Sequence, residues 1–225
     1  MPILLDDGSL YGTLCAASSE RKPLNDQAEQ VLLLFANLIS QHIQKEQLVQ
    51  QLHKANAELL TQSHTDALTA LPNRRAILAG LAQLFAIAQR SGRQVLIAFV
   101  DLDGFKQIND QYGHDAGDVF LQQAATRLQS GIRQGDLLGR LGGDEFVAIG
   151  LGPEIETEAG QALAMLKSRL GNTLLGEYTL PGCRLDYAGA SIGAVAVHPG
   201  LMTTEQAMQQ ADAAMYAEKK SRRGR

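Results

Sequence analysis

Hydrophobic and polar positions divide the chain into a short N-terminal segment, a long helical stretch and an α/β region. Apolar runs at 3–5 and 10–16 flank turn residues at 6–8, which predicts strand, turn and strand within residues 1–24. From residue 26 to residue 63 the chain has neither proline nor glycine, so we expect one helix in the connecting segment 25–63.

Apolar residues recur along this helix at steps of three and four. They are Val31, Phe35, Leu38, Val49, Leu52 and Leu59. Three polar residues continue the same register, namely His42, Lys45 and Asn56. Polar residues at such positions set the register and oligomeric state of coiled coils. Because the helix exceeds the usual globular length, we expect a coiled-coil-like dimer helix rather than a helix packed on its own domain.

Residues 64–225 alternate between helical and strand patterns. The expected order is helix 73–90, strand 95–100, helices 105–111 and 117–132, strands 137–141 and 146–149, helix 156–170, one or two strands within 184–197, and helix 203–221. The run 95–100 is apolar throughout, which suits a central buried strand. The pattern predicts an α+β domain with a mixed central sheet flanked by helices.

Composition narrows the classes of partner. The 225 residues carry a formal net charge of −4, so no basic field exists to attract nucleic acid. Apolar runs stay short of the roughly 18 residues of a membrane span, and the N-terminus lacks a signal-peptide pattern. Cys15 and Cys183 fit neither a disulfide framework nor a zinc site. We therefore expect a cytoplasmic protein with no nucleic-acid and no membrane partner.

Acidic residues stand at two places that the predicted sheet could bring together. Asp101 follows the central strand, and Asp144 and Glu145 follow Gly142 and Gly143 in the predicted hairpin. Converging carboxylates repel unless a hard cation lies between them, and glycines let a phosphate approach the backbone. This favours a magnesium site for a nucleoside triphosphate. The alternative is a solvated acidic turn beside a helix cap.

Six segments, in order, resemble the GGDEF family of diguanylate cyclases. The signature Gly-Gly-Asp-Glu-Phe is at 142–146, and the other segments are 66–75, 101–110, 112–118, 190–193 and 211–216. Ala70 departs from the family's usual glycine. The resemblance implies a GGDEF fold, which is palm-like as in nucleotidyl cyclases. It also implies condensation of two GTP molecules into cyclic di-GMP with release of two pyrophosphates.

The resemblance implies roles at the metal and the reacting groups. Asp101, Asp144 and Glu145 would bind Mg²⁺, or Mn²⁺ in its place, through carboxylates, and Leu102 through its backbone carbonyl. Asp144 would help to deprotonate the attacking 3′-hydroxyl, and Glu145 and Lys106 would complete the catalytic set.

It also implies how GTP is bound. Phosphate contacts would come from the backbone N–H groups of Phe105 and Lys106, from Gly142 and Gly143, and from Lys219 and Arg223. Glu218 and Arg222 stand where the family usually has Ala and Gly. Asn109 and Asp118 would read guanine, and a buried Asp118 would reject ATP because adenine lacks the matching donors. The alternatives are a solvated basic tail and two helix-capping residues.

Regulation is implied by two further features. Arg133 and Asp136 precede the signature at the spacing of the family's inhibitory site for cyclic di-GMP, although a surface salt bridge would have the same pattern. The segment Asp-Gly-Ser-Leu-Tyr-Gly-Thr-Leu-Cys-Ala-Ala-Ser at 7–18 resembles the end of a GAF sensor domain. Catalysis requires two facing GTP sites and hence a homodimer. The alternatives are a silent module that binds GTP or cyclic di-GMP, a cyclase or polymerase for another nucleotide, and a structural adaptor.

Overall fold

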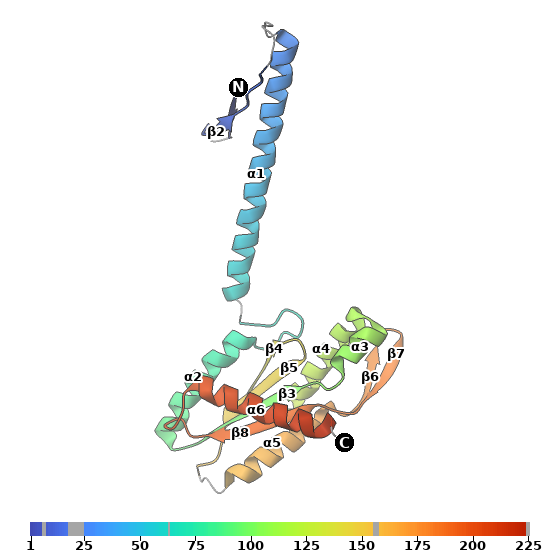
Figure 1. Ribbon diagram of the computed structural model, residues 1–225. Helices are drawn as coiled ribbons and strands as arrows, with labels where there is room; N and C mark the ends of the chain where they lie inside the picture. The colour runs from blue at the N-terminus through green and yellow to red at the C-terminus, as the bar shows by residue number, and fades with distance from the viewer. Residues whose placement is uncertain (6–7, 18–24, 63, 155–157, 224–225) are drawn as a thin grey trace. The chain divides into compact units, whose positions relative to one another are not determined.

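Figure 1 shows the computed structural model, which describes residues 1–5, 8–17, 25–62, 64–154 and 158–223. The chain divides into two compact units, Met1–Ser63 and His64–Arg225. Within the described ranges, each helix is too short or too polar to cross a lipid bilayer.

The first unit consists of a hairpin and the long helix. Strands β1 (Pro2–Leu4) and β2 (Leu10–Thr13) pair antiparallel, and α1 spans Asp26–Gln62. Ile3 and Ala36 are buried, and the Ser40 hydroxyl donates a hydrogen bond to the Leu4 carbonyl oxygen (2.6 Å), so the hairpin packs on the helix. The expected hairpin and helix are confirmed, although β2 ends three residues before the predicted strand; Asp6 and Asp7 of the predicted turn lie outside the described residues.

The predicted apolar seam of α1 faces solvent within this single chain. Its described members, between 44% and 67% exposed, are Val31, Phe35, Leu38, Val49 and Leu52. The side chains of Asn56 and Leu59, predicted for the same seam, lie outside the described part of the chain.

The second unit contains the α/β elements in the predicted order. The helices are α2 (Arg74–Ser91), α3 (Phe105–Tyr112), α4 (His114–Gly131), α5 (Ala159–Leu174) and α6 (Thr204–Arg223). The strands are β3 (Val95–Asp101), β4 (Leu137–Gly142), β5 (Glu145–Leu151), β6 (Gly176–Leu180), β7 (Cys183–Tyr187) and β8 (Ser191–Val197). Helix α4 begins three residues earlier than predicted, and α5 runs to Leu174. Residues 156–157 of the predicted fifth helix lie outside the description.

A four-stranded sheet in the order β4-β5-β3-β8 forms the centre of this unit. Its strand pairs are antiparallel, and an isolated parallel bridge joins Asn73 to Arg140 at its edge. Every residue of the central strand β3 is buried. One face of the sheet packs against α2 and α6, and the other against α3, α4 and α5 (Figure 1). The α+β prediction with a helix-flanked central sheet is confirmed.

Strand β6 was missed in the sequence analysis, which left residues 176–180 unassigned. It pairs antiparallel with β7 in a separate two-stranded sheet, turning at Pro181 and Gly182. The side chain of Tyr178 in β6 is buried, and its ring packs against Phe120 of α4 with ring centroids 4.7 Å apart. Packing of Tyr178 against α4 therefore stabilises β6, a strand too short to be predicted from its sequence pattern.

Candidate active site

The acidic residues come together where β3 ends. Asp101 is opposite Glu145 of β5 on one side and Ser191 of β8 on the other. The Leu102 N–H donates to the Asp144 carbonyl oxygen (3.2 Å), which ties the hairpin turn to the end of the central strand. The end of β3 therefore lies next to Glu145 and to the turn that carries Asp144.

The electrostatics of these carboxylates reflect their closeness. Burial and the Asp101 carboxylate raise the pKa of Asp144. Burial also raises the pKa of Glu145, with further contributions from Asp101, Asp144 and Asp212. Asp144 and Glu145 are thus destabilised in their charged forms, and a positive charge placed beside them would relieve the repulsion.

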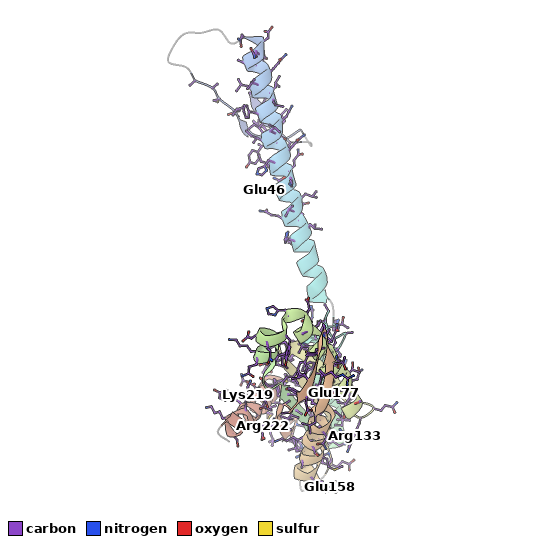
Figure 2. All side chains as sticks on the ribbon, turned by 90° about the vertical axis from the view of Figure 1, so that its right-hand side faces the viewer. Glu46, Arg133, Glu158, Glu177, Lys219 and Arg222 are labelled. Atoms are coloured by element: carbon purple, nitrogen blue, oxygen red, sulfur yellow. The ribbon has the colours of Figure 1, made fainter. Side chains whose placement is uncertain are left out.

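Lys219 supplies one such charge. Its ammonium nitrogen lies 2.7 Å from both carboxylate oxygens of Asp101. Asp101 is a buried residue, with 5% of its surface exposed. Lys219 is labelled on α6 in Figure 2. The sequence analysis placed it on substrate phosphates, whereas here it holds an acid expected to bind metal. The Arg223 side chain, the second predicted phosphate contact on this helix, lies outside the described residues.

The donor set at this position fits a hard divalent cation. The residues predicted as ligands, the carboxylates of Asp101, Asp144 and Glu145 and the Leu102 carbonyl, are of the oxygen types that magnesium prefers. Among the described side chains, no three His, Cys, Asp or Glu already stand together as a formed metal centre. Since Lys219 covers Asp101, an incoming cation would have to move this ammonium away.

Arg140, which the sequence analysis missed, links the signature turn to Asp66 through hydrogen bonds. Its Nε and Nη2 donate to the Gly143 carbonyl oxygen (2.9 and 2.8 Å), and Nη1 donates to Asp66 Oδ1 (2.9 Å). Asp66 also accepts from the N–H and hydroxyl of Thr69. Burial alone would raise the pKa of Asp66, but the bonds from Thr69 and Arg140 outweigh it and lower the pKa. Gly143 itself adopts φ 52°, which glycine allows without strain.

Asn109, predicted to read guanine, lies against Gly117, the residue before Asp118. A Cβ on Gly117 would lie 1.9 Å from Asn109 Oδ1 and 3.3 Å from the Phe105 ring, so Asn109 would have to shift to admit a larger residue where α4 passes α3. Asp118 follows in α4 and is exposed, contrary to the buried position expected. Rejection of ATP by a pre-buried acceptor therefore does not apply to this open arrangement.

The predicted phosphate donors sit at the start of α3. The Phe105 N–H already donates to the Leu102 carbonyl oxygen (3.3 Å) and so does not point freely to a ligand. Lys106 is the second residue of α3, where a backbone N–H has no acceptor within the helix, and its side chain is exposed. Of the two predicted N–H donors, Lys106 fits the role better.

The predicted inhibitory pair lies apart from these residues, as the label of Arg133 in Figure 2 shows. Asp136 Oδ2 accepts from the Arg133 N–H (3.1 Å) and lies 3.7 Å from Nη2 of Arg169. Arg169, missed in the sequence analysis because it comes from α5, has a buried Nε with no hydrogen-bond partner among the described residues. Arg133 also lines a cavity of about 400 Å³ with Arg93 and Gln161.

Comparison with known families matches most of the chain. Residues 63–225 match the family described as "Diguanylate cyclase, GGDEF domain". Diguanylate cyclase DgcP of Escherichia coli K12 is 51% identical over 219 residues, covering 97% of this chain and 63% of that protein. Diguanylate cyclase DgcP of Pseudomonas aeruginosa is 30% identical, covering 97% of this chain and 32% of that protein. The chain thus spans less than two thirds of either relative.

Solved structures agree with this match. A sensory box/GGDEF family protein from Caulobacter crescentus superposes with a TM-score of 0.65 at 34% identity, covering 71% of this chain and 99% of that one. The coiled coil and GGDEF domain of Caulobacter DgcB, solved in complex with c-di-GMP, gives a TM-score of 0.60 at 26% identity, covering 84% and 95%. With the acidic cluster in place at the signature turn, the chain belongs to the GGDEF family of diguanylate cyclases.

Proposed function

We propose that this protein is a diguanylate cyclase, which condenses two GTP molecules into cyclic di-GMP and releases two pyrophosphates. The observation that carries the proposal is the meeting of Asp101, Asp144 and Glu145 at the end of β3, with raised pKa values at the two signature acids. The 51% identity to a protein named diguanylate cyclase supports it.

In this proposal Asp144 accepts the proton of the attacking 3′-hydroxyl. The 3′-oxygen of one GTP then bonds to the α-phosphorus of the other while the bond to pyrophosphate breaks, and a second such exchange closes the ring. A divalent cation held by Asp101, Asp144, Glu145 and the Leu102 carbonyl would polarise the triphosphate and acidify the hydroxyl.

The remaining site residues bind and orient GTP. Asn109 and Asp118 pair with guanine, and Phe105 packs beside them. The Lys106 N–H, Gly142 and Gly143 approach the phosphates. Lys219 moves from Asp101 to a phosphate when the cation and nucleotide enter, and Arg223 joins it from the same helix. Catalysis is then largely positioning.

Two such sites must face each other, so the active form is a homodimer. The exposed apolar seam of α1 supports this, because an unpaired row of such residues on a long helix is stabilised by pairing with a second copy. The hairpin preceding α1 is, in this proposal, the end of a GAF sensor domain, whose input would act through the helix.

Cyclic di-GMP also inhibits the enzyme in this proposal, at Arg133 and Asp136. Arg169, whose buried Nε has no hydrogen-bond partner in the described part of the chain, adds a guanidinium beside Asp136 that suits a phosphate or a guanine. The Caulobacter DgcB structures, solved in complex with c-di-GMP, show that relatives of this chain bind the product.

The proposal is tested by incubating the protein with Mg²⁺ and either GTP or ATP and identifying the products by chromatography and mass. Cyclic di-GMP and pyrophosphate from GTP alone are expected. If GTP and cyclic di-GMP bind but no product forms, the chain is the silent binding module instead.

A further inference from the structure

Asp103 joins three elements of the fold next to the phosphate-binding loop. Its Oδ1 accepts a hydrogen bond from the hydroxyl of Ser191 (2.8 Å), at the start of β8. Its Oδ2 accepts from Nη1 of Arg222 (2.7 Å), on α6. Both oxygens are therefore held by residues far away in sequence, although Asp103 itself belongs to the connection between β3 and α3.

Arg222 makes a second contact within the same network. Its Nη1 also donates to the carbonyl oxygen of Ala190, just before β8. Arg222 and Lys219 are three residues apart on α6, so they share one face of its last turn (Figure 2). This turn thus places two cations on Asp103 and Asp101, the two acids that flank Leu102.

The loop 101–106, which Asp103 anchors, contains the predicted contacts to the GTP phosphates, so its geometry should affect nucleotide binding. Gly104, which follows Asp103, has φ 77°, and the next residues begin α3 with the Lys106 N–H at its second position. A carboxylate anchored on both oxygens limits the movement of this glycine-containing connection. Preorganised donors bind phosphate more tightly than donors that must first be ordered.

The same contacts contribute little to global stability. Arg222 is 44% exposed and Asp103 33% exposed in their side chains. Ion pairs this open to solvent typically contribute less than about 1 kcal/mol to folding. A loss of binding on removing Arg222 can therefore be separated from unfolding.

We propose that Arg222 is a positioning residue for the substrate: through Asp103 it fixes the 101–106 loop that binds the GTP triphosphate. The inference rests on the proposed function for the identity of the nucleotide.

The test measures the Kd of a non-hydrolysable GTP analogue with Mg²⁺, together with KM and kcat for GTP and the Tm. Arg222→Ala should raise Kd and KM about fivefold, equivalent to about 1 kcal/mol, with kcat within about twofold. Arg222→Lys should restore part of the loss. The matched control is Lys220→Ala, two residues before Arg222, whose ammonium lies over the Tyr216 ring instead.

A double-mutant cycle with Ser191→Ala sharpens the test. Because both partners act through Asp103, their effects on Kd should be less than additive. The proposal is overturned if Arg222→Ala leaves Kd unchanged, if Lys220→Ala gives the same loss, or if the wild-type protein binds no GTP analogue. A wild type that binds the analogue but forms no cyclic di-GMP refutes the proposed function alone, and the Kd comparison still decides the role of Arg222.

Discussion

Lys219 holds both carboxylate oxygens of Asp101 at 2.7 Å, so the end of the central strand already carries a cation of the protein's own. In the proposed function, a divalent cation and this ammonium would compete for one buried acid. Lys219→Met should therefore raise the affinity for Mn²⁺ without nucleotide, by about tenfold, and weaken binding of GTP.

The Mn²⁺ affinity is measured by calorimetric titration, with Lys220→Met as the control for lost surface charge. Unchanged or weaker Mn²⁺ binding in Lys219→Met would show that the ammonium does not compete for Asp101.

Asp66 makes stability depend on acid pH. Hydrogen bonds and Arg140 lower the pKa of Asp66 in the folded state. The contribution of Asp66 to the free energy of unfolding is therefore complete above the pKa of the unfolded chain, about 3.9, and is lost as pH falls through the lower pKa of the folded state. Asp66→Asn should cost about 1.5 kcal/mol at neutral pH and less as the pH falls from about 5 to about 3. Urea unfolding measures the difference in free energy of unfolding between the wild type and Asp66→Asn, with Asp110→Asn at an exposed position as the control. A difference that stays the same at low pH would contradict the role of the Asp66 carboxylate.

Ala70 is a strained residue, with φ 57° in the left-handed region. It is the one non-glycine residue with positive φ among the described ranges. Ala70→Gly should stabilise the fold by about 1 kcal/mol, a rise in Tm of about 3 °C, because glycine adopts this conformation without strain. Ala67→Gly, nearby without positive φ, should lower Tm instead. Equal shifts in the two variants would rule out backbone strain.

Product inhibition tests the cluster around Asp136. Arg133→Ala and Arg169→Ala should each raise the cyclic di-GMP concentration for half-inhibition by at least about tenfold, because each removes a charge-assisted contact. Rates are normalised to each variant without product, and Arg90→Ala, on the exposed end of α2, serves as the control. Inhibition that is unchanged in both variants would place the inhibitory site elsewhere.

The dimer helix is tested at Leu52, which is 67% exposed. Leu52→Asp should shift the protein to monomer in sedimentation and reduce activity most at low protein concentration, because it buries a charge in the seam. Gln50→Asp adds the same charge on α1 away from the seam and should leave the dimer intact. A wild-type monomer with full activity would refute the dimer requirement.

Local patterns were enough to predict much of the fold. The apolar run of β3, the glycine turn after β4 and the proline-free stretch of α1 each produced the expected element. Strand β6 was missed because five alternating residues carry little signal, although Pro181 and Gly182 mark its turn.

The site was predicted less completely, because its contacts join distant segments. The motif order indicated that Asp101 and Asp144 meet, but spacing alone cannot show that Arg140 reaches Asp66 or that Arg169 of α5 faces Asp136. Asp118 was expected to be buried, as rejection of ATP through an unpaired acceptor would require, yet its position in α4 is exposed.

The most direct test of the central claim is the product formed from GTP. With Mg²⁺ present, mass spectrometry should find cyclic di-GMP with two pyrophosphates for each molecule, and Asp144→Asn should form none while staying folded. Burial and the Asp101 carboxylate raise the pKa of Asp144 in the folded state. Ionised Asp144 therefore lowers the stability of the fold as pH rises through this raised pKa. Asp144→Asn should consequently be at least as stable as the wild type at neutral pH. No cyclic di-GMP from the dimeric wild-type protein, or equal amounts from Asp144→Asn, would contradict the account.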